Sequence, residues 1–164
     1  MEPGIFRSRR LAAGQSALEF ALIMPVFLLL VFGVMDFGRL LFVQENVQQA
    51  VNLGARYAST GNHQSGTDPK TGQPYSRVTS IGNYILQQAS VSTSMGATLA
   101  TVQISSVLGG VGSAGGPQDI ETVSVTTTVP LMTPVISNFF PNRQFTFTGS
   151  ATIKNEPFPP GQTK

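Results

Sequence analysis

The sequence predicts an α+β protein in which one long N-terminal helix crosses a membrane and carries a small domain made of a helix and an antiparallel β-meander. Two observations lead to this prediction. The run from Phe20 to Met35 contains no charged residue and follows Arg7, Arg9 and Arg10, which is typical of a membrane-spanning helix with a cytoplasmic N-terminus. Later segments alternate strictly between apolar and polar residues, which indicates strands with one buried face.

The composition fits one small domain on an anchor. Of the 164 residues, 41% are hydrophobic and 11% are charged, a balance that argues against a disordered tail. Residues 1–14 carry three arginines and one glutamate, whereas the rest of the chain has seven residues of each sign. The excess of basic over acidic residues is therefore confined to the N-terminal end, and no patch for nucleic acid is predicted. The lack of cysteine excludes disulfides and thiolate metal sites.

The long helix is expected to run from Gln15 to about Ser59, where Gly61 and Asn62 supply a stop signal. About 45 residues at a rise of 1.5 Å span roughly 68 Å, more than twice the roughly 30 Å of a bilayer's hydrocarbon. The helix must therefore project from the membrane, and its projecting part has an apolar stripe that needs a surface to pack on. The expected stripe comprises Phe37, Leu40, Leu41, Val47, Val51, Ala55 and Ala58.

The remaining residues predict the small domain. Residues 60–75 are rich in Gly, Ser, Thr and Pro and indicate an exposed loop. Residues 76–89 have an apolar helical stripe, and strands with one apolar face are expected at 101–105, 123–129 and 145–154. The second helix and the projecting helix are the expected covers of the sheet.

Glu19 is the unusual residue of the anchor, because a carboxylate costs about 2.5–3.5 kcal/mol at mid-bilayer and calls for a partner charge near the span. Three interpretations of the N-terminus compete. A secretory signal peptide is disfavoured, because no small-residue cleavage site follows Val34. A plain single-span anchor explains the arginines and the apolar run but leaves Glu19 and Gly14 unexplained.

The third interpretation is a prepilin. A short basic leader ends at Gly14, the fifth residue after it is Glu19, and Phe20 follows. This arrangement resembles the TadE-like family of minor pseudopilins from the tight-adherence (Tad) pilus system. The resemblance extends to Pro25 and to residues 36–39, 54–58 and 150–157.

The resemblance implies a pilin-like fold and a function in the assembly or initiation of a Tad-type (type IVb-like) adhesion pilus. It also implies that a prepilin peptidase cuts between Gly14 and Gln15. The new ammonium group at Gln15 would lie one helical turn from Glu19, so the Glu19 carboxylate of one subunit could face the ammonium group of its neighbour, with Phe20 beside it. In an alternative that stays open, Glu19 only extends to the lipid headgroups. TadE-type and TadF-type roles both fit.

The implied organisation has a basic leader at residues 1–14, a membrane-spanning and projecting helix at 15–59 and a periplasmic α+β domain at 60–164. The implied location is the bacterial inner membrane, which the chain crosses once with its N-terminus in the cytoplasm. Incorporation into the pilus is implied as a second location. The implied partners are the prepilin peptidase, the major and other minor pilins, the inner-membrane assembly machinery and membrane lipid.

Three further features of the anchor and domain carry predictions. Asp36 and Arg39 stand three residues apart where the helix leaves the lipid and are expected to form an interfacial pair. Pro25 predicts either a functional bend or a tolerated kink. The apolar segment 130–141 is predicted to be either a subunit contact or a buried connection.

No catalytic function, cofactor or metal is expected, so the protein is not expected to be an enzyme. His63 is the only histidine and falls in a polar loop, where a solvated side chain is expected. Residues 110–115 match the GxGxxG pattern, but Pro117 and a strand follow where a dinucleotide site needs a helix, so a turn is expected. An alternative function is that of a single-span envelope-anchored sensor or binding protein without prepilin processing.

Overall fold

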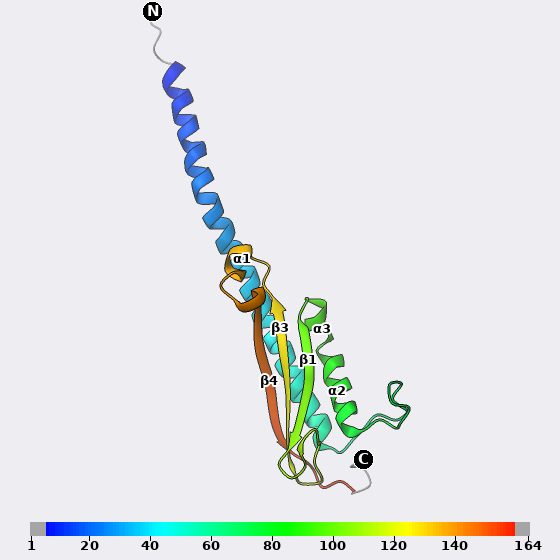
Figure 1. The fold of residues 1–164 in the computed structure, drawn as a ribbon. Helices are drawn as coiled ribbons and strands as arrows, with labels where there is room; N and C mark the ends of the chain where they lie inside the picture. Colours follow the sequence, from blue (N-terminus) through cyan, green and yellow to red (C-terminus); the bar gives the residue numbers. More distant parts are fainter. Residues whose placement is uncertain (1–5, 160–164) are drawn as a thin grey trace, which may run out of the picture.

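The computed structural model describes residues 6–159, with side chains from residue 14 onward (Figure 1). Helix α1 (Phe6–Ser59) is 54 residues long and ends where the sequence predicts. It begins nine residues before the expected start at Gln15, which fits the high helix propensity of preceding residues such as Leu11 and Ala12. The first part of α1 stands apart from the domain, and its second part lies along the sheet (Figure 1).

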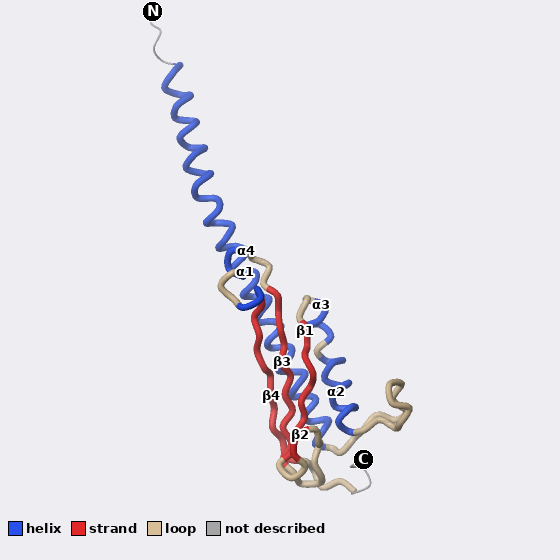
Figure 2. Tube along the Cα trace, in the orientation of Figure 1, coloured by secondary structure: helices blue, strands red, loops and turns tan. Residues whose placement is uncertain are grey.

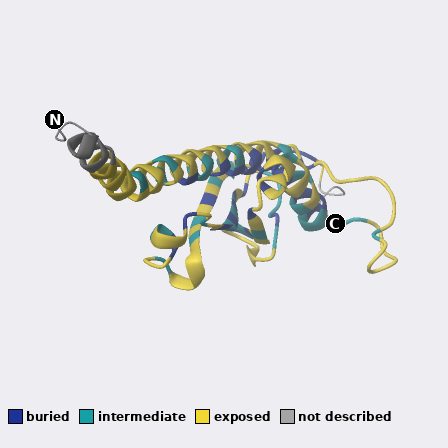
Figure 3. Ribbon diagram, turned by 90° about the horizontal axis from the view of Figure 1, so that it is seen from above, coloured by how far each residue is buried: buried dark blue, intermediate teal, exposed yellow. Residues whose placement is uncertain are grey.

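One helix in the described chain is long and apolar enough to cross a membrane. It is α1 from Gly14 to Ser59, whose most apolar window has a mean hydropathy of 2.5 and contains no buried residue. Figure 3 shows the first described turns of α1 largely exposed, whereas the later turns have a buried face. This is the single-pass anchor that the sequence predicts.

The domain follows α1 and contains one sheet. Its strands are antiparallel in the order β2-β1-β3-β4, with Val123 in β3 opposite Ile104 in β1 and Ala151 in β4. The predicted α+β architecture is thus confirmed. The elements are α2 (Arg77–Gln88), α3 (Ser90–Ser94), β1 (Thr98–Ser106), β2 (Gly110–Val111), β3 (Ile120–Pro130), α4 (Pro134–Ser137), the 3-10 helix η1 (Pro141–Arg143) and β4 (Gln144–Lys154).

The second helix forms close to its predicted bounds. Ser76 is the N-cap of α2, and its hydroxyl oxygen accepts a hydrogen bond from the Thr79 N–H at 3.1 Å. This bond satisfies one of the N–H groups that a helix start leaves without an intrahelical partner. Ile81 and Ile85 on one face of α2 are fully buried, as their helical spacing predicts.

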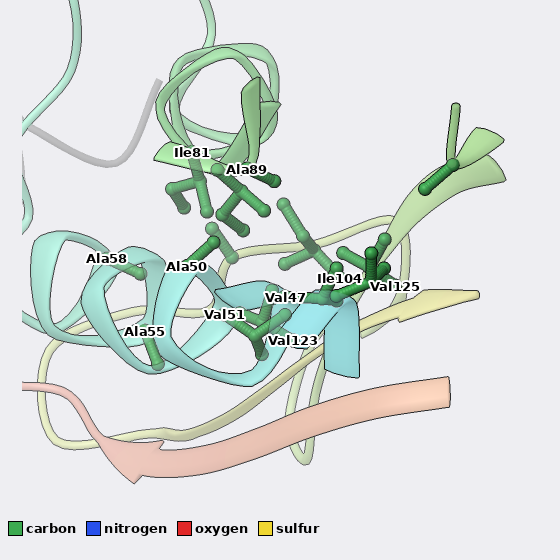
Figure 4. Packing of buried hydrophobic residues seen from close by; sticks show 14 of the residues in the cluster. Val47, Ala50, Val51, Ala55, Ala58, Ile81, Ala89, Ile104, Val123 and Val125 are labelled. Carbon is green, nitrogen blue, oxygen red and sulfur yellow. The ribbon is translucent and has the colours of Figure 1, made fainter. Parts of the chain in front are cut away.

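The core lies between the sheet and the two helices, α1 and α2, which cover one face of it (Figure 4). Alternate residues of β3 point into this core, as expected for a strand with one covered face. The predicted covers of the sheet are therefore confirmed. The buried cluster includes Val43, Val47, Ala50, Val51, Ala55, Ala58, Ile81, Ile85, Ile104, Val123, Val125 and Val129.

The predicted stripe on α1 is wrong at its beginning. Phe37 and Leu41 are 62% and 47% exposed, whereas Val43 and Ala50, which were not in the predicted stripe, are buried. One residue along a helix rotates the side chain by about 100°, so Phe37 points well away from the face that Asp36 presents to the domain.

A buried arginine, Arg77, connects the elements at the end of the domain that lies farthest from the anchor. Arg77 Nη2 lies 3.8 Å from Glu121 Oε2, and both side chains are almost fully buried. Arg77 Nη2 also donates to the Ala58 carbonyl at 2.9 Å, and Nη1 donates to the Gly115 carbonyl at 2.7 Å. The guanidinium group stacks 4.7 Å from the ring centroid of Phe158. Arg77 therefore joins the last turn of α1 to the β2–β3 connection and the C-terminal segment.

Burial raises the pKa of Glu121 to about 7, although Arg77 opposes the rise, and the nearby Asp119 adds to it. A free carboxyl has a pKa of 4.5, so between these values the folded chain binds a proton that the unfolded chain releases. The contribution of Glu121 to the free energy of unfolding is therefore greatest below pH 4.5, and it falls as the pH rises to 7. At about 1.4 kcal/mol per pKa unit the loss reaches about 3 kcal/mol.

We expect Glu121→Gln to remove this pH dependence, because a neutral amide does not titrate. Urea unfolding of the detergent-solubilised chain at a series of pH values between 4.5 and 8 measures it. Exposed Glu156→Gln is the matched control and should keep the wild-type slope. An equal slope in the wild-type and Glu121→Gln chains would contradict the assignment.

Candidate functional site

The predicted processing and assembly residues lie on the exposed first part of α1. The side chains of Gln15, Glu19 and Phe20 are all exposed. Gln15 Nε2 donates to Glu19 Oε1 at 3.2 Å, which is the contact expected four residues apart on one helix face. An ammonium group formed at Gln15 would therefore start the same helix face, one turn from the Glu19 carboxylate.

Gly14 has no packing role in the described chain. A Cβ added to Gly14 would find no described atom within 4 Å. Its backbone is helical, so no left-handed conformation demands glycine either. Nothing in the described part of the chain therefore requires glycine at this position.

Phe20 and its neighbours have no cover from their own chain. Phe20 is 64% exposed, and most of the large apolar side chains from Leu22 to Met35 are exposed as well. Side chains of this kind are stable when lipid or another helix surrounds them. A carboxylate beside them, such as that of Glu19, is costly unless it faces water, headgroups or a positive charge. The exposed surface can therefore pack against lipid or another helix, and Glu19 can face water, headgroups or a positive charge.

Asp36 and Arg39 lie where α1 meets the domain, and the structure gives both of them domain partners. The Asp36 carboxylate is buried and accepts hydrogen bonds from the N–H groups of Met132 at 3.1 Å and Thr133 at 2.7 Å. Arg39 donates from Nε to the Met95 carbonyl at 2.8 Å and from Nη1 to the Pro130 carbonyl at 2.9 Å. The two residues thus clamp the domain to α1, and a direct pair between them stays a prediction.

The apolar segment 130–141 contacts both α1, through Ile136 beside Gly33, and the sheet, through Phe140 beside Phe145 of β4. Thr133 and Ser137 are buried, whereas Met132, Val135 and Phe139 are 75%, 52% and 83% exposed. The segment is therefore neither a fully buried connection nor a polar loop. Its exposed apolar side chains lie near the anchor, because α4 lies beside α1 (Figure 2).

A cleft of about 380 Å³ separates this segment from α1. Apolar side chains dominate its walls, and Asp36 and Arg39 are its charged residues. It is lined by Phe32, Met35, Asp36, Arg39, Met132, Thr133 and Pro134.

The loop with the histidine and the glycine-rich turn lie where the sequence predicts them. His63 is exposed in the loop after α1. Residues 110–115 form the short strand β2 and a turn, with positive φ angles at Gly110, Gly112 and Gly115, so the predicted turn is confirmed. Within the described part of the chain, no group of three or more His, Asp or Glu side chains is placed to hold a metal ion.

Comparison with known proteins bears on the anchor. The family model described as TadE-like protein matches residues 14–56. No match was found among curated proteins or among solved structures. The family match begins at Gly14 and ends within the last turn of α1, so it covers the exposed span, both clamp residues and much of the face that packs on the sheet. The resemblance drawn from the sequence is thus confirmed over residues 14–56: the anchor helix is TadE-like, and the chain is a Tad pilus-associated protein.

Proposed function

We propose that this chain is a minor pseudopilin, without catalytic activity, that acts in the assembly or initiation of a Tad-type pilus. The observation that carries the proposal is the TadE-like match, because it starts at Gly14 and includes Gln15, Glu19 and Phe20. These residues lie exposed on a helix that its own domain leaves uncovered. A helix with this surface is suited to pack among other pilin helices.

The proposed location is the bacterial inner membrane. Arg7, Arg9 and Arg10 precede the span and favour a cytoplasmic N-terminus, because basic residues next to a span are retained on that side. The α+β domain then lies in the periplasm. In this orientation the leader is accessible to an inner-membrane prepilin peptidase, and the domain is accessible to other pilins.

The proposed processing removes residues 1–14 and creates an ammonium group at Gln15. That Gly14 packs against nothing described supports a role in recognition by the peptidase, which needs a small residue at the cut. The new positive charge then pairs with Glu19 of an adjacent major or minor pilin within the membrane. Contacts with the inner-membrane assembly machinery would follow from this position.

The size of the domain favours a minor role. Major pilins of the Tad system, as the resemblance implies, are little more than the helix, whereas this chain adds a domain with its own sheet after Ser59. In a thin filament of helices stacked at short axial steps, such a domain on every subunit would crowd its neighbours. A few copies at the start or tip of the filament avoid this crowding.

A deletion strain tests the proposal. We expect the strain to lose most of its pili while the major pilin is still made and processed, because initiation fails before elongation. Expression of the wild-type chain should restore pili, and intact mass spectrometry should find a mature chain that begins at Gln15. Gly14→Leu should block both the cleavage and the rescue. The matched variant Gly14→Ala adds only one methyl group and should be cleaved more readily than Gly14→Leu.

Three results would contradict the proposal. A mature native chain that retains Arg7, Arg9 and Arg10 would favour the unprocessed envelope sensor or binding protein. Normal piliation in the deletion strain would exclude a role in initiation. A copy number in sheared filaments close to that of the major pilin would exclude a minor role.

A further inference from the structure

Residues 130–142, here called the return loop, lie beside the point where α1 leaves the membrane. Ile136 in α4 packs directly on Gly33 of α1, where its Cδ1 would be 3.0 Å from an added Cβ. Gly33 belongs to the uncharged run that ends at Met35. The return loop is therefore level with the last turn of the membrane span (Figure 2).

The length of the uncharged run fixes the depth of Gly33. The run from Phe20 to Met35 has 16 residues, which at 1.5 Å each cover about 24 Å. A bilayer's hydrocarbon is roughly 30 Å thick, so the whole run is needed to cross it. Gly33 and the side chain of Ile136 that contacts it thus lie at or below the hydrocarbon boundary on the domain's side.

The return loop has the surface of a membrane contact. No Asp, Glu, Lys or Arg occurs between Glu121 and Arg143. Within the loop, the side chains of Met132, Val135 and Phe139 are exposed. Met132 lines the same cleft as Phe32 and Met35 of α1, so the exposed apolar surfaces of the loop and of α1 adjoin each other. Exposed apolar patches that adjoin each other in this way mark contact sites with lipid or protein.

The backbone of the loop is also prepared for an environment without water. Polar backbone groups at membrane depth must be paired within the protein. The Asp36 carboxylate accepts the N–H groups of Met132 and Thr133, and Arg39 donates to the Pro130 carbonyl. These bonds hold the start of the loop against α1 and pair the charged groups of Asp36 and Arg39 with the backbone of the loop.

We propose that the return loop is a second membrane contact of this protein, in addition to the span. The side chains of Met132, Val135 and Phe139 enter the acyl-chain boundary of the leaflet on the domain's side. The proposal requires only that α1 crosses a membrane, so it does not depend on prepilin processing or on a role in assembly. With the clamp of Asp36 and Arg39, this contact fixes the tilt of the domain above the bilayer.

The chain contains no tryptophan, so the indole fluorescence of a variant with one introduced tryptophan comes from that position alone. Phe139→Trp places it at the loop tip, and Leu108→Trp places it at the opposite end of the sheet, where the side chain is equally exposed at 85%. Full-length protein is reconstituted in vesicles of phosphatidylcholine and phosphatidylglycerol with brominated acyl chains. We expect the fluorescence of Phe139→Trp to be quenched several-fold more than that of Leu108→Trp and to lie at shorter wavelength, because bromine quenches only indoles within the acyl region.

Met132→Trp gives a second probe in the return loop and should behave like Phe139→Trp. If both loop probes are quenched no more than Leu108→Trp, the loop lies in water and the proposal is wrong. If the loop probes emit at short wavelength without quenching by brominated lipid, and the shift grows with the protein-to-lipid ratio, a second copy of the chain covers the loop in place of lipid. That result would also overturn the proposal.

Discussion

Replacement of Gly54 by leucine is expected to force α2 away from α1 and to lower the free energy of unfolding by about 3 kcal/mol, at the upper end of the range for overpacked cores. A Cβ at Gly54 would overlap Cγ1 and Cδ1 of Ile85. Ile85 is fully buried among residues of α1 and β1, so its side chain has little room to move. Thermal and urea unfolding of the detergent-solubilised chain, followed by circular dichroism, measures the loss.

Gly38→Leu is the matched control, because a Cβ at Gly38 of the same helix meets no described atom within 4 Å. This variant should be as stable as the wild type or gain up to about 1 kcal/mol from its better helix propensity. Ile85→Ala combined with Gly54→Leu should recover part of the loss, since it removes both overlapping atoms. Equal stability of Gly54→Leu and Gly38→Leu would mean that α1 and α2 do not pack as described.

The long elements of the fold could be predicted because their patterns repeat. Apolar and polar residues alternate along the whole of β4, and this defines the buried face of the strand. The apolar residues of α2, such as Ile81 and Ile85, recur at helical spacing, and this defines the buried face of the helix. The elements α3, α4 and β2 were not predicted, since two to five residues are too few to show a period. Phe37 was wrongly assigned to the buried stripe of α1 for a different reason. Some apolar residues of α1 face lipid and others face the sheet, and their spacing in the sequence does not separate the two groups.

The site was predictable only where its signal is local. Gly14 and Glu19 are neighbours in the sequence, whereas Asp36 and the N–H of Thr133 are 97 residues apart and meet only after the sheet has formed. Glu121 did have a sequence signal, because it falls on the same face of β3 as Val123 and Val125. A carboxylate in a row of buried valines implies a buried partner, but nothing in the spacing identifies that partner as Arg77.

Replacement of Glu19 by glutamine is expected to abolish most incorporation into pili while the chain still inserts, folds and is processed. The only described bond of the Glu19 carboxylate is with Gln15 on the same exposed helix face. Such a pair contributes a few tenths of a kcal/mol, and an amide costs less than a carboxylate near lipid. The fold therefore does not need the negative charge of Glu19. Pairing with the ammonium group of a neighbouring subunit does need this charge.

Glu45→Gln separates this effect from a general loss of charge, because Glu45 is an exposed carboxylate on the projecting part of the same helix. Each variant is expressed in the deletion strain, and the measurements are resistance to alkaline extraction from membranes, the mass of the mature chain and the copy number in sheared filaments. We expect all variants to remain in the membrane with the same mature N-terminus, and Glu19→Gln alone to be depleted from filaments. Wild-type copy numbers for Glu19→Gln at low expression would show that the carboxylate only extends to the headgroups, because a side chain in that position has no partner to lose.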